Sequence, residues 1–188
     1  MTRLVSTENI EGSQVESFIQ KKMIGEWSWN SFKTSQHDEV LQIYNDTNCY
    51  TIIGGSSKDK FEWKSNFSAF PLVNKVIHKG FWRGAKAVLC DKEYVEVENM
   101  MFIGHSRGGA ISSVLCYMKE CKGVGFGSPK AFRKKVSIRF CNIKNPLDPV
   151  CHVVPTFKTV GNVLKLRFIK NPHTKYGDHI SDMEVAKY

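Results

Sequence analysis

The residues best suited to chemistry lie in the stretch Gly104–Gly108, which reads Gly-His-Ser-Arg-Gly. This is the G-x-S-x-G pattern of a nucleophile elbow, a sharp turn that presents a serine hydroxyl between a strand and a helix. The apolar run Asn99–Ile103 predicts a buried strand before it, and Arg107–Met118 predicts a helix with small residues in its first turns. A plain turn in which Ser106 caps an ordinary helix fits the same residues, so the local sequence leaves both interpretations open.

A nucleophilic serine needs a general base and an acid that orients the base, in the chain order Ser, Asp or Glu, His. Asp148 follows the predicted strand Val136–Ile143, at the strand end where a triad acid belongs. His152 is four residues beyond Asp148 and is interpreted as a structural histidine. His173 and His179 lie in a late loop, so either could serve as the base.

The elements that must position these residues alternate between strand and helix in the middle of the chain. This alternation predicts an α/β fold with a mostly parallel central sheet and helices on its faces. An early helix ends near Gly25, and Trp27, Trp29 and Phe32 are expected to pack along a wrapped segment. The other expected elements are a hairpin of Glu39–Tyr44 and Cys49–Ile53, a helix over Val73–Leu89, a buried strand over Gly123–Phe126 and a second hairpin within Phe157–Ile169.

Length and composition predict one globular domain over residues 1–188. The chain is 41% hydrophobic and 24% charged, which is ordinary globular usage. Apolar runs stay well below the roughly 18 residues of a membrane span. The first 13 residues contain Glu8 and Glu11 and no apolar block, so we expect no secretory signal, a cytoplasmic location by default and reduced thiols at the six cysteines. No cofactor and no metal site are expected.

The chain has 27 basic and 18 acidic residues, which gives a formal net charge of +9. Without a block of five like charges, a zinc-finger spacing or an aromatic RNA-binding motif, no nucleic-acid partner is expected. Lys58, Lys60 and Lys64 surround Phe61 and Trp63, a mixture that favours peripheral contact with an anionic membrane surface. A generally basic surface without a directed partner remains the alternative, and the oligomeric state is open.

Several segments resemble the class 3 lipases, the fungal triacylglycerol lipase family, and they occur in the family's order. The stretch from Gly104 to Ala110 resembles the family's Gly-His-Ser-Leu-Gly-Gly-Ala elbow. Asp148–Pro155 resembles the loop with the catalytic Asp, and Asp178–Ser181 the segment with the catalytic His. Further matches are Ile53–Ser57 with Trp63, Val76–Phe81 and Gly125–Pro129.

The resemblance implies a compact α/β-hydrolase fold with a mostly parallel central sheet and helices on both faces. It implies Ser106 as nucleophile, Asp148 as orienting acid and His179 as base. It also implies an oxyanion hole formed by Ser56 and the N–H of Arg107. The expected activity is that of a triacylglycerol lipase or carboxylesterase-like serine hydrolase, acting on a lipid or small ester substrate.

Two departures from the family pattern stand beside the predicted site. Gly54 replaces the usual Arg before the oxyanion Gly, and Arg107 replaces a Leu, placing a charge at the start of the elbow helix. The span Lys58–Lys64 falls where the family has its lid and reads either as a short lid or as a surface turn. A phospholipase, thioesterase or acyltransferase with the same triad, and an inactive hydrolase fold serving as a binding module, are the alternatives.

Overall fold

The protein is built on one seven-stranded sheet. The computed structural model describes residues 12–55, 72–73, 76–146, 148–152 and 156–166. The described helices are α2 (Gly12–Lys22), α4 (Lys79–Leu89), α5 (Arg107–Lys119) and the short 3₁₀ turn η1 (Pro149–His152). The strands are β1 (Ser28–Lys33), β2 (Glu39–Tyr44), β3 (Asn48–Ile53), β4 (Leu72–Val73), β5 (Ile77–His78), β6 (Asn99–His105), β7 (Lys122–Phe126), β8 (Arg139–Lys144) and β9 (Asn162–Lys165).

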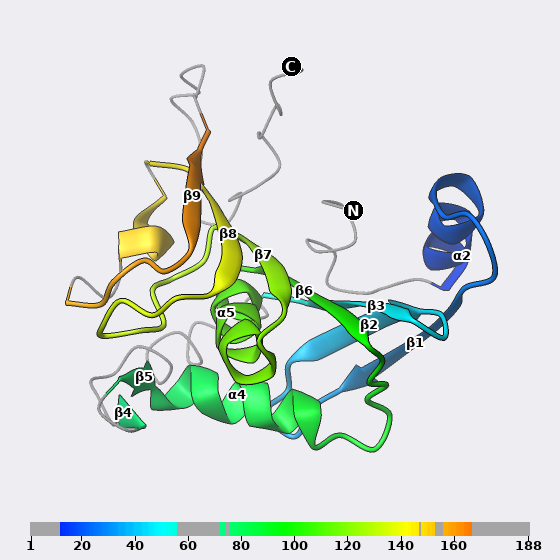
Figure 1. The fold of residues 1–188 in the computed structure, drawn as a ribbon, viewed down its shortest axis with the longest axis horizontal. Coiled ribbons are helices and arrows are strands. Elements are labelled where there is room, and N and C mark those ends of the chain that lie inside the picture. Colours follow the sequence, from blue (N-terminus) through cyan, green and yellow to red (C-terminus); the bar gives the residue numbers. More distant parts are fainter. Residues whose placement is uncertain (1–11, 56–71, 74–75, 147, 153–155, 167–188) are drawn as a thin grey trace.

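The sheet has the strand order β1-β2-β3-β6-β7-β8-β9, as Figure 1 shows. Strands β1 to β3 form an antiparallel meander, and β3, β6, β7, β8 and β9 run parallel to one another. The turn between β2 and β3 is held by Asn45, whose Oδ1 accepts the N–H groups of Thr47 and Asn48. Both the predicted hairpin and the mostly parallel sheet are therefore confirmed.

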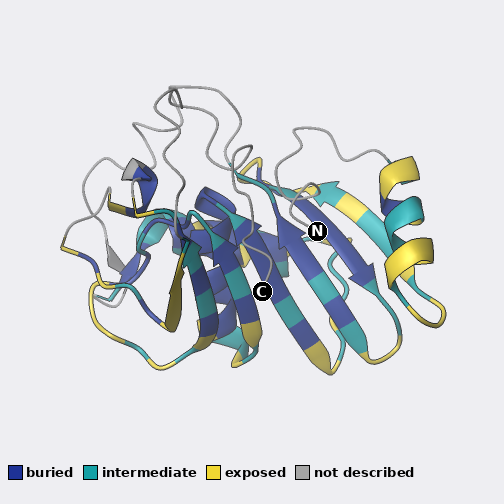
Figure 2. Ribbon diagram, turned by 90° about the horizontal axis from the view of Figure 1, so that it is seen from above, coloured by how far each residue is buried: buried dark blue, intermediate teal, exposed yellow. Residues whose placement is uncertain are grey.

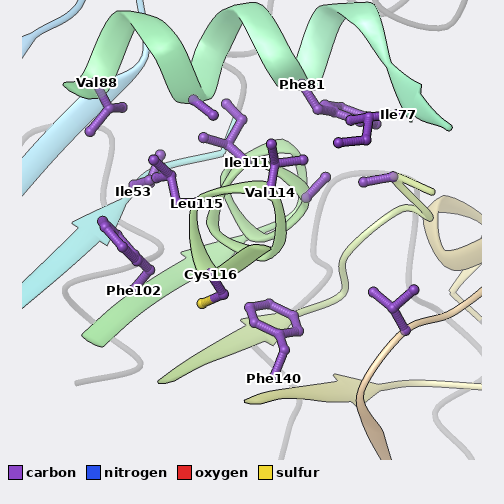
Figure 3. Packing of buried hydrophobic residues seen from close by; sticks show 14 of the residues in the cluster. Ile53, Ile77, Phe81, Val88, Phe102, Ile111, Val114, Leu115, Cys116 and Phe140 are labelled. Atoms are coloured by element: carbon purple, nitrogen blue, oxygen red, sulfur yellow. The ribbon is translucent and has the colours of Figure 1, made fainter. Parts of the chain in front are cut away.

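Helices cover both faces of the sheet, as the sequence predicts. The crossovers from β3 to β6 and from β6 to β7 run in the same direction across the sheet, and right-handed crossovers of that kind place α4 and α5 on one face. Their side chains form the main core with Ile53, Phe102 and Phe140 (Figure 3). On the other face, Val15 of α2 packs against a second cluster that includes Leu41.

One buried glutamine ties the meander to the segment that leads into β6. Gln42 is fully buried, and its Nε2 donates to the carbonyl oxygen of Val95 at 2.9 Å and to Thr51 Oγ1 at 3.0 Å. Its Oε1 accepts the N–H of Val95 at 2.8 Å. The amide thus pairs both backbone groups of Val95, which are partly buried.

Three expected elements differ from those observed. The stretch with Trp29 forms strand β1, because it pairs along its whole length with β2. The helix expected over Val73–Leu89 begins at Lys79, where the side chain of His78 caps the N–H of Gly80, and short strands precede it.

The second hairpin expected within Phe157–Ile169 is also wrong over the residues that the structure describes. Gly161 does turn the chain with φ +69°, but β9 pairs in parallel with β8, whereas Lys158 bridges to Phe132. The side chain of Asn142 on β8 donates to the carbonyl oxygen of Val160 at 2.7 Å and so holds the turn against the sheet.

Burial falls from the centre of the sheet toward its β9 edge, as Figure 2 shows. All four residues of β9 are exposed, whereas β2 and β3 each contain consecutive buried residues, so both of their faces are covered. None of the helices in the described part of the chain combines the length and apolar character needed to cross a bilayer.

We predict that Gln42→Met lowers the free energy of unfolding by about 3 kcal/mol, because it leaves the partly buried N–H and C=O of Val95 without partners and removes the bond to buried Thr51. Urea denaturation followed by circular dichroism measures the loss. The matched control is Gln36→Met on the exposed β1–β2 turn, which we expect to change stability by less than about 0.5 kcal/mol. Equal effects of the two substitutions would contradict the role given to Gln42.

Candidate active site

Ser106 occupies the sharp turn between β6 and α5 in a backbone conformation that L-residues rarely adopt. Its φ is 50° and its ψ is −120°, and its N–H donates to the carbonyl oxygen of Phe126 on β7 at 2.8 Å. Within this described turn, the Ser106 hydroxyl makes no capping hydrogen bond to α5. Ser106 is therefore the N-cap residue of α5 without a side-chain cap, and its strained turn has the geometry expected of a nucleophile elbow.

The glycines around the elbow are required by close backbone contacts. A Cβ on Gly104 would lie 2.3 Å from the carbonyl oxygen of Gly108, inside the first turn of α5. A Cβ on Gly108 would lie 2.3 Å from the carbonyl oxygens of Ile53 and Gly54 at the end of β3. Any side chain at either position would push α5 away from the sheet, so both positions require glycine.

The end of β3 approaches the elbow from the side. A Cβ on Gly55 would lie 3.5 Å from Cβ of Ser106 and 3.1 Å from Nδ1 of His105. Gly54 is tied to the meander through its N–H, which donates to the carbonyl oxygen of Glu39 at 2.9 Å. Ser56, the predicted oxyanion donor, follows directly but lies outside the described residues.

Asp148 lies beyond the end of β8, at the same sheet edge as Ser106. Its side chain is buried, and its Oδ1 accepts the N–H of Val150 at 2.9 Å. A Cβ built on Gly127 would lie 2.9 Å from Asp148 Oδ2, and Gly127 directly follows the residue that accepts the Ser106 N–H. The carboxyl ends of β6, β7 and β8 thus bring the predicted nucleophile and the predicted acid to one edge, where open α/β sheets bind their ligands.

A buried thiol contacts the Asp148 carboxylate, and a buried lysine lies nearby. Cys151 Sγ donates to Asp148 Oδ2 at 3.6 Å. Burial, and next the charge of Asp148, raise the pKa of Cys151 to about 12, so this side chain remains a neutral donor at neutral pH. Burial lowers the pKa of Lys144, whose Nζ donates to Thr159 Oγ1 at 3.3 Å. No sequence signal marks Cys151, because only the turn η1 brings its thiol back to the acid.

The Arg107 side chain turns away from the nucleophile into the protein. Its Nε donates to Asp38 Oδ1 at 2.7 Å and its Nη2 to Asp38 Oδ2 at 3.2 Å, and both side chains are buried. The positive charge expected at the start of the elbow helix is therefore paired below it. Burial, and secondly this guanidinium, lower the pKa of His78. No local motif marks Asp38, which lies 69 residues from its partner.

The remaining histidines divide into described and undescribed positions. His78 caps α4, and His152 is exposed, with Nε2 3.3 Å from the carbonyl oxygen of Pro146. His179 and its rival His173 lie outside the described residues, as do Lys58, Lys60 and Lys64 with their neighbouring aromatic residues. Among the residues that are described, no group of three or more His, Cys, Asp and Glu side chains could hold a metal ion.

Comparison with solved structures relates this fold to lipases. The lipase–propeptide complex of Rhizomucor miehei superimposes with a TM-score of 0.55 at 17% sequence identity, covering 73% of this chain and 56% of that one. A lipase from Rhizopus microsporus var. chinensis gives 0.54 at 16% identity, covering 77% and 60%. A mutant form of MDLA from Penicillium cyclopium gives 0.53 at 13% identity, covering 88% and 84%.

These similarities define the fold as the α/β fold of lipases. At such low identity they establish the architecture and carry no activity with it. The chain spans little more than half the length of the Rhizomucor and Rhizopus structures. No protein-family model matches the sequence, and no curated protein matches it in a sequence search.

We predict that Gly108→Ala lowers the free energy of unfolding by about 3 kcal/mol, because its methyl group would overlap two carbonyl oxygens that cannot move without displacing β3. Thermal and urea unfolding measure the change. Gly54→Ala is the matched control, since a Cβ there would meet nothing closer than 3.6 Å. A loss for Gly54→Ala as large as that for Gly108→Ala would refute the packing argument.

Proposed function

We propose that this protein is a serine carboxylic-ester hydrolase of lipase type, which cleaves acyl esters of lipids through an acyl-enzyme intermediate. The observation that carries the proposal is the strained, uncapped conformation of Ser106 at the end of a central parallel strand. A backbone in this region costs of order 1–3 kcal/mol, and such residues cluster at active sites. The fold shared with lipases supports the same conclusion.

In the proposed mechanism, Oγ of Ser106 attacks the acyl carbonyl carbon and its proton passes to His179. The negative charge that develops on the carbonyl oxygen is stabilised by the backbone N–H of Arg107 and by Ser56. Collapse of this tetrahedral species breaks the ester bond, and the alcohol leaves with the proton held by His179. Water then attacks the acyl-enzyme while His179 accepts its proton. When the second tetrahedral species collapses, His179 returns the proton to Oγ of Ser106 and the acid is released.

Asp148 has the role of orienting the base and stabilising the imidazolium form. The described surroundings suit a fixed carboxylate, because the Val150 N–H and the Cys151 thiol hold its two oxygens. The neutral thiol adds no negative charge beside the carboxylate, which suits a group that stabilises a cationic base. These contacts support Asp148 as the acid independently of the motif that first indicated it.

We predict that a fluorophosphonate probe labels Ser106, and that Ser106→Ala abolishes labelling and lowers ester hydrolysis by at least about 10³-fold. Intact-protein mass spectrometry and peptide mapping locate the label. Ser31→Ala, an exposed serine on β1, is the control that should retain full labelling. Absence of labelling at Ser106 in the unaltered protein would favour an inactive binding module.

A panel of esters then defines the substrate within the proposed class. We expect hydrolysis of triacylglycerol and long-chain esters for the lipase. Preferential turnover of phospholipids or thioesters, or transfer of the acyl group to an added alcohol, would identify one of the alternative activities that share the triad. All of these outcomes require Ser106, so the panel separates substrates and not mechanisms.

We predict that His179→Ala reduces kcat by about 10³-fold or more, because the nucleophile loses its proton acceptor, whereas His173→Ala retains most activity. His152→Ala serves as a further control at an exposed position outside the proposed machinery. Ester hydrolysis at pH 7 to 8 measures all three. A severe loss in His173→Ala with normal turnover in His179→Ala would transfer the role of base to His173.

A further inference from the structure

The elbow is supported from below by a buried ion pair that the proposed mechanism does not use. Arg107, the first residue of α5, donates through two nitrogens to both carboxylate oxygens of Asp38, at 2.7 and 3.2 Å. Because a guanidinium and a carboxylate joined at both ends are coplanar, the pair fixes an orientation as well as a distance. The ion pair therefore anchors Arg107, the same residue whose backbone N–H is proposed to stabilise the oxyanion.

Asp38 is itself fixed within the turn between β1 and β2. Its N–H donates to Thr34 Oγ1 at 3.1 Å, and its carbonyl oxygen accepts the N–H of Thr34 at 3.0 Å. The next residue, Glu39, accepts the N–H of Gly54 at 2.9 Å. The β1–β2 connection therefore contacts both segments that border Ser106. Asp38 binds the start of α5, and Glu39 accepts a hydrogen bond from the end of β3.

We propose that the Asp38–Arg107 pair is a positioning device that holds the start of α5, which carries the proposed oxyanion donor N–H of Arg107, at a fixed separation from the end of β3. This inference rests on the proposed hydrolase function. Arg107 contributes to catalysis through its backbone N–H, and Asp38 contributes only through Arg107. The pair thus acts on the rate of the chemical step and leaves the binding of substrate unchanged.

Stability by itself does not explain the pair. Replacing a buried ion pair with well-packed apolar side chains is often neutral or stabilising, because desolvation offsets the attraction between the charges. The pair joins a turn to the start of a helix 69 residues away, and its two-point geometry fixes how these two segments are oriented. The departure at position 107, where the resembling family has Leu, is thereby accounted for.

The test compares Asp38→Asn with the unaltered protein. Asn keeps the size of the side chain and one acceptor oxygen but loses the second contact and the charge. Glu96→Gln is the matched control, because Glu96 forms an exposed pair with Lys119 at 2.6 Å on another part of the surface. The measurements are kcat and KM for a soluble chromogenic ester, together with inhibition by a trifluoromethyl ketone, which forms a tetrahedral oxyanion adduct with serine.

We expect Asp38→Asn to lower kcat by about 10- to 100-fold and to weaken binding of the ketone inhibitor by a similar factor. KM should stay nearly unchanged. Glu96→Gln should match the unaltered protein in all three quantities. Each variant is assayed below its unfolding midpoint, with active sites counted by the fluorophosphonate. If Asp38→Asn does not fold, Arg107→Lys, which keeps both charges but loses the two-point contact, carries the same expectation with a smaller loss.

Two results would overturn the inference and are distinguishable. If Asp38→Asn lowers the unfolding midpoint while kcat per labelled site and ketone affinity stay unchanged, the pair is structural and the proposed function stands. If the unaltered protein neither hydrolyses esters nor reacts with the probe at Ser106, the proposed function fails and the positioning role fails with it.

Discussion

The close contact between the start of α5 and the ends of β6 and β3 is the constraint on which the rest of the site depends. Gly104 and Gly108 bring peptide backbones together at separations that no side chain permits. Only this approach allows Ser106 to bridge strand and helix in its strained conformation while its N–H remains bonded to β7. The energy stored at Ser106 is therefore held by packing of the neighbouring glycines, in the way that functional strain is usually maintained.

The sheet converts this local constraint into a site. Parallel strands β6, β7 and β8 end at one edge, so the loops after them converge although they are far apart in sequence. Placement of α4 and α5 on one face leaves that edge bounded by loops and by the end of β3. The architecture shared with the Rhizomucor and Rhizopus lipases thus places Ser106 and Asp148 together, while the chemistry remains a property of the individual side chains.

Buried polar groups stabilise the parts of the site that apolar packing cannot orient. Asp38 with Arg107, and Asp148 with Val150 and Cys151, satisfy buried donors and acceptors beside the proposed site. In a low-dielectric interior such bonds are stronger than in water, and leaving one partner unpaired is costly. They therefore favour one arrangement of the segments over others with similar apolar contacts.

Local sequence patterns predict the sharp turn at Ser106, the hairpin and the parallel centre of the sheet, because these rest on glycine spacing, an asparagine turn and continuous apolar runs. The sequence also indicated Asp148 from its place after a strand. Tertiary structure alone decided that Phe157–Ile169 contains no hairpin over the described residues, that β9 joins β8 in parallel, and that Arg107 is buried against Asp38. Those outcomes depend on contacts between residues many positions apart, and no local pattern encodes which distant group a strand edge or a guanidinium will meet.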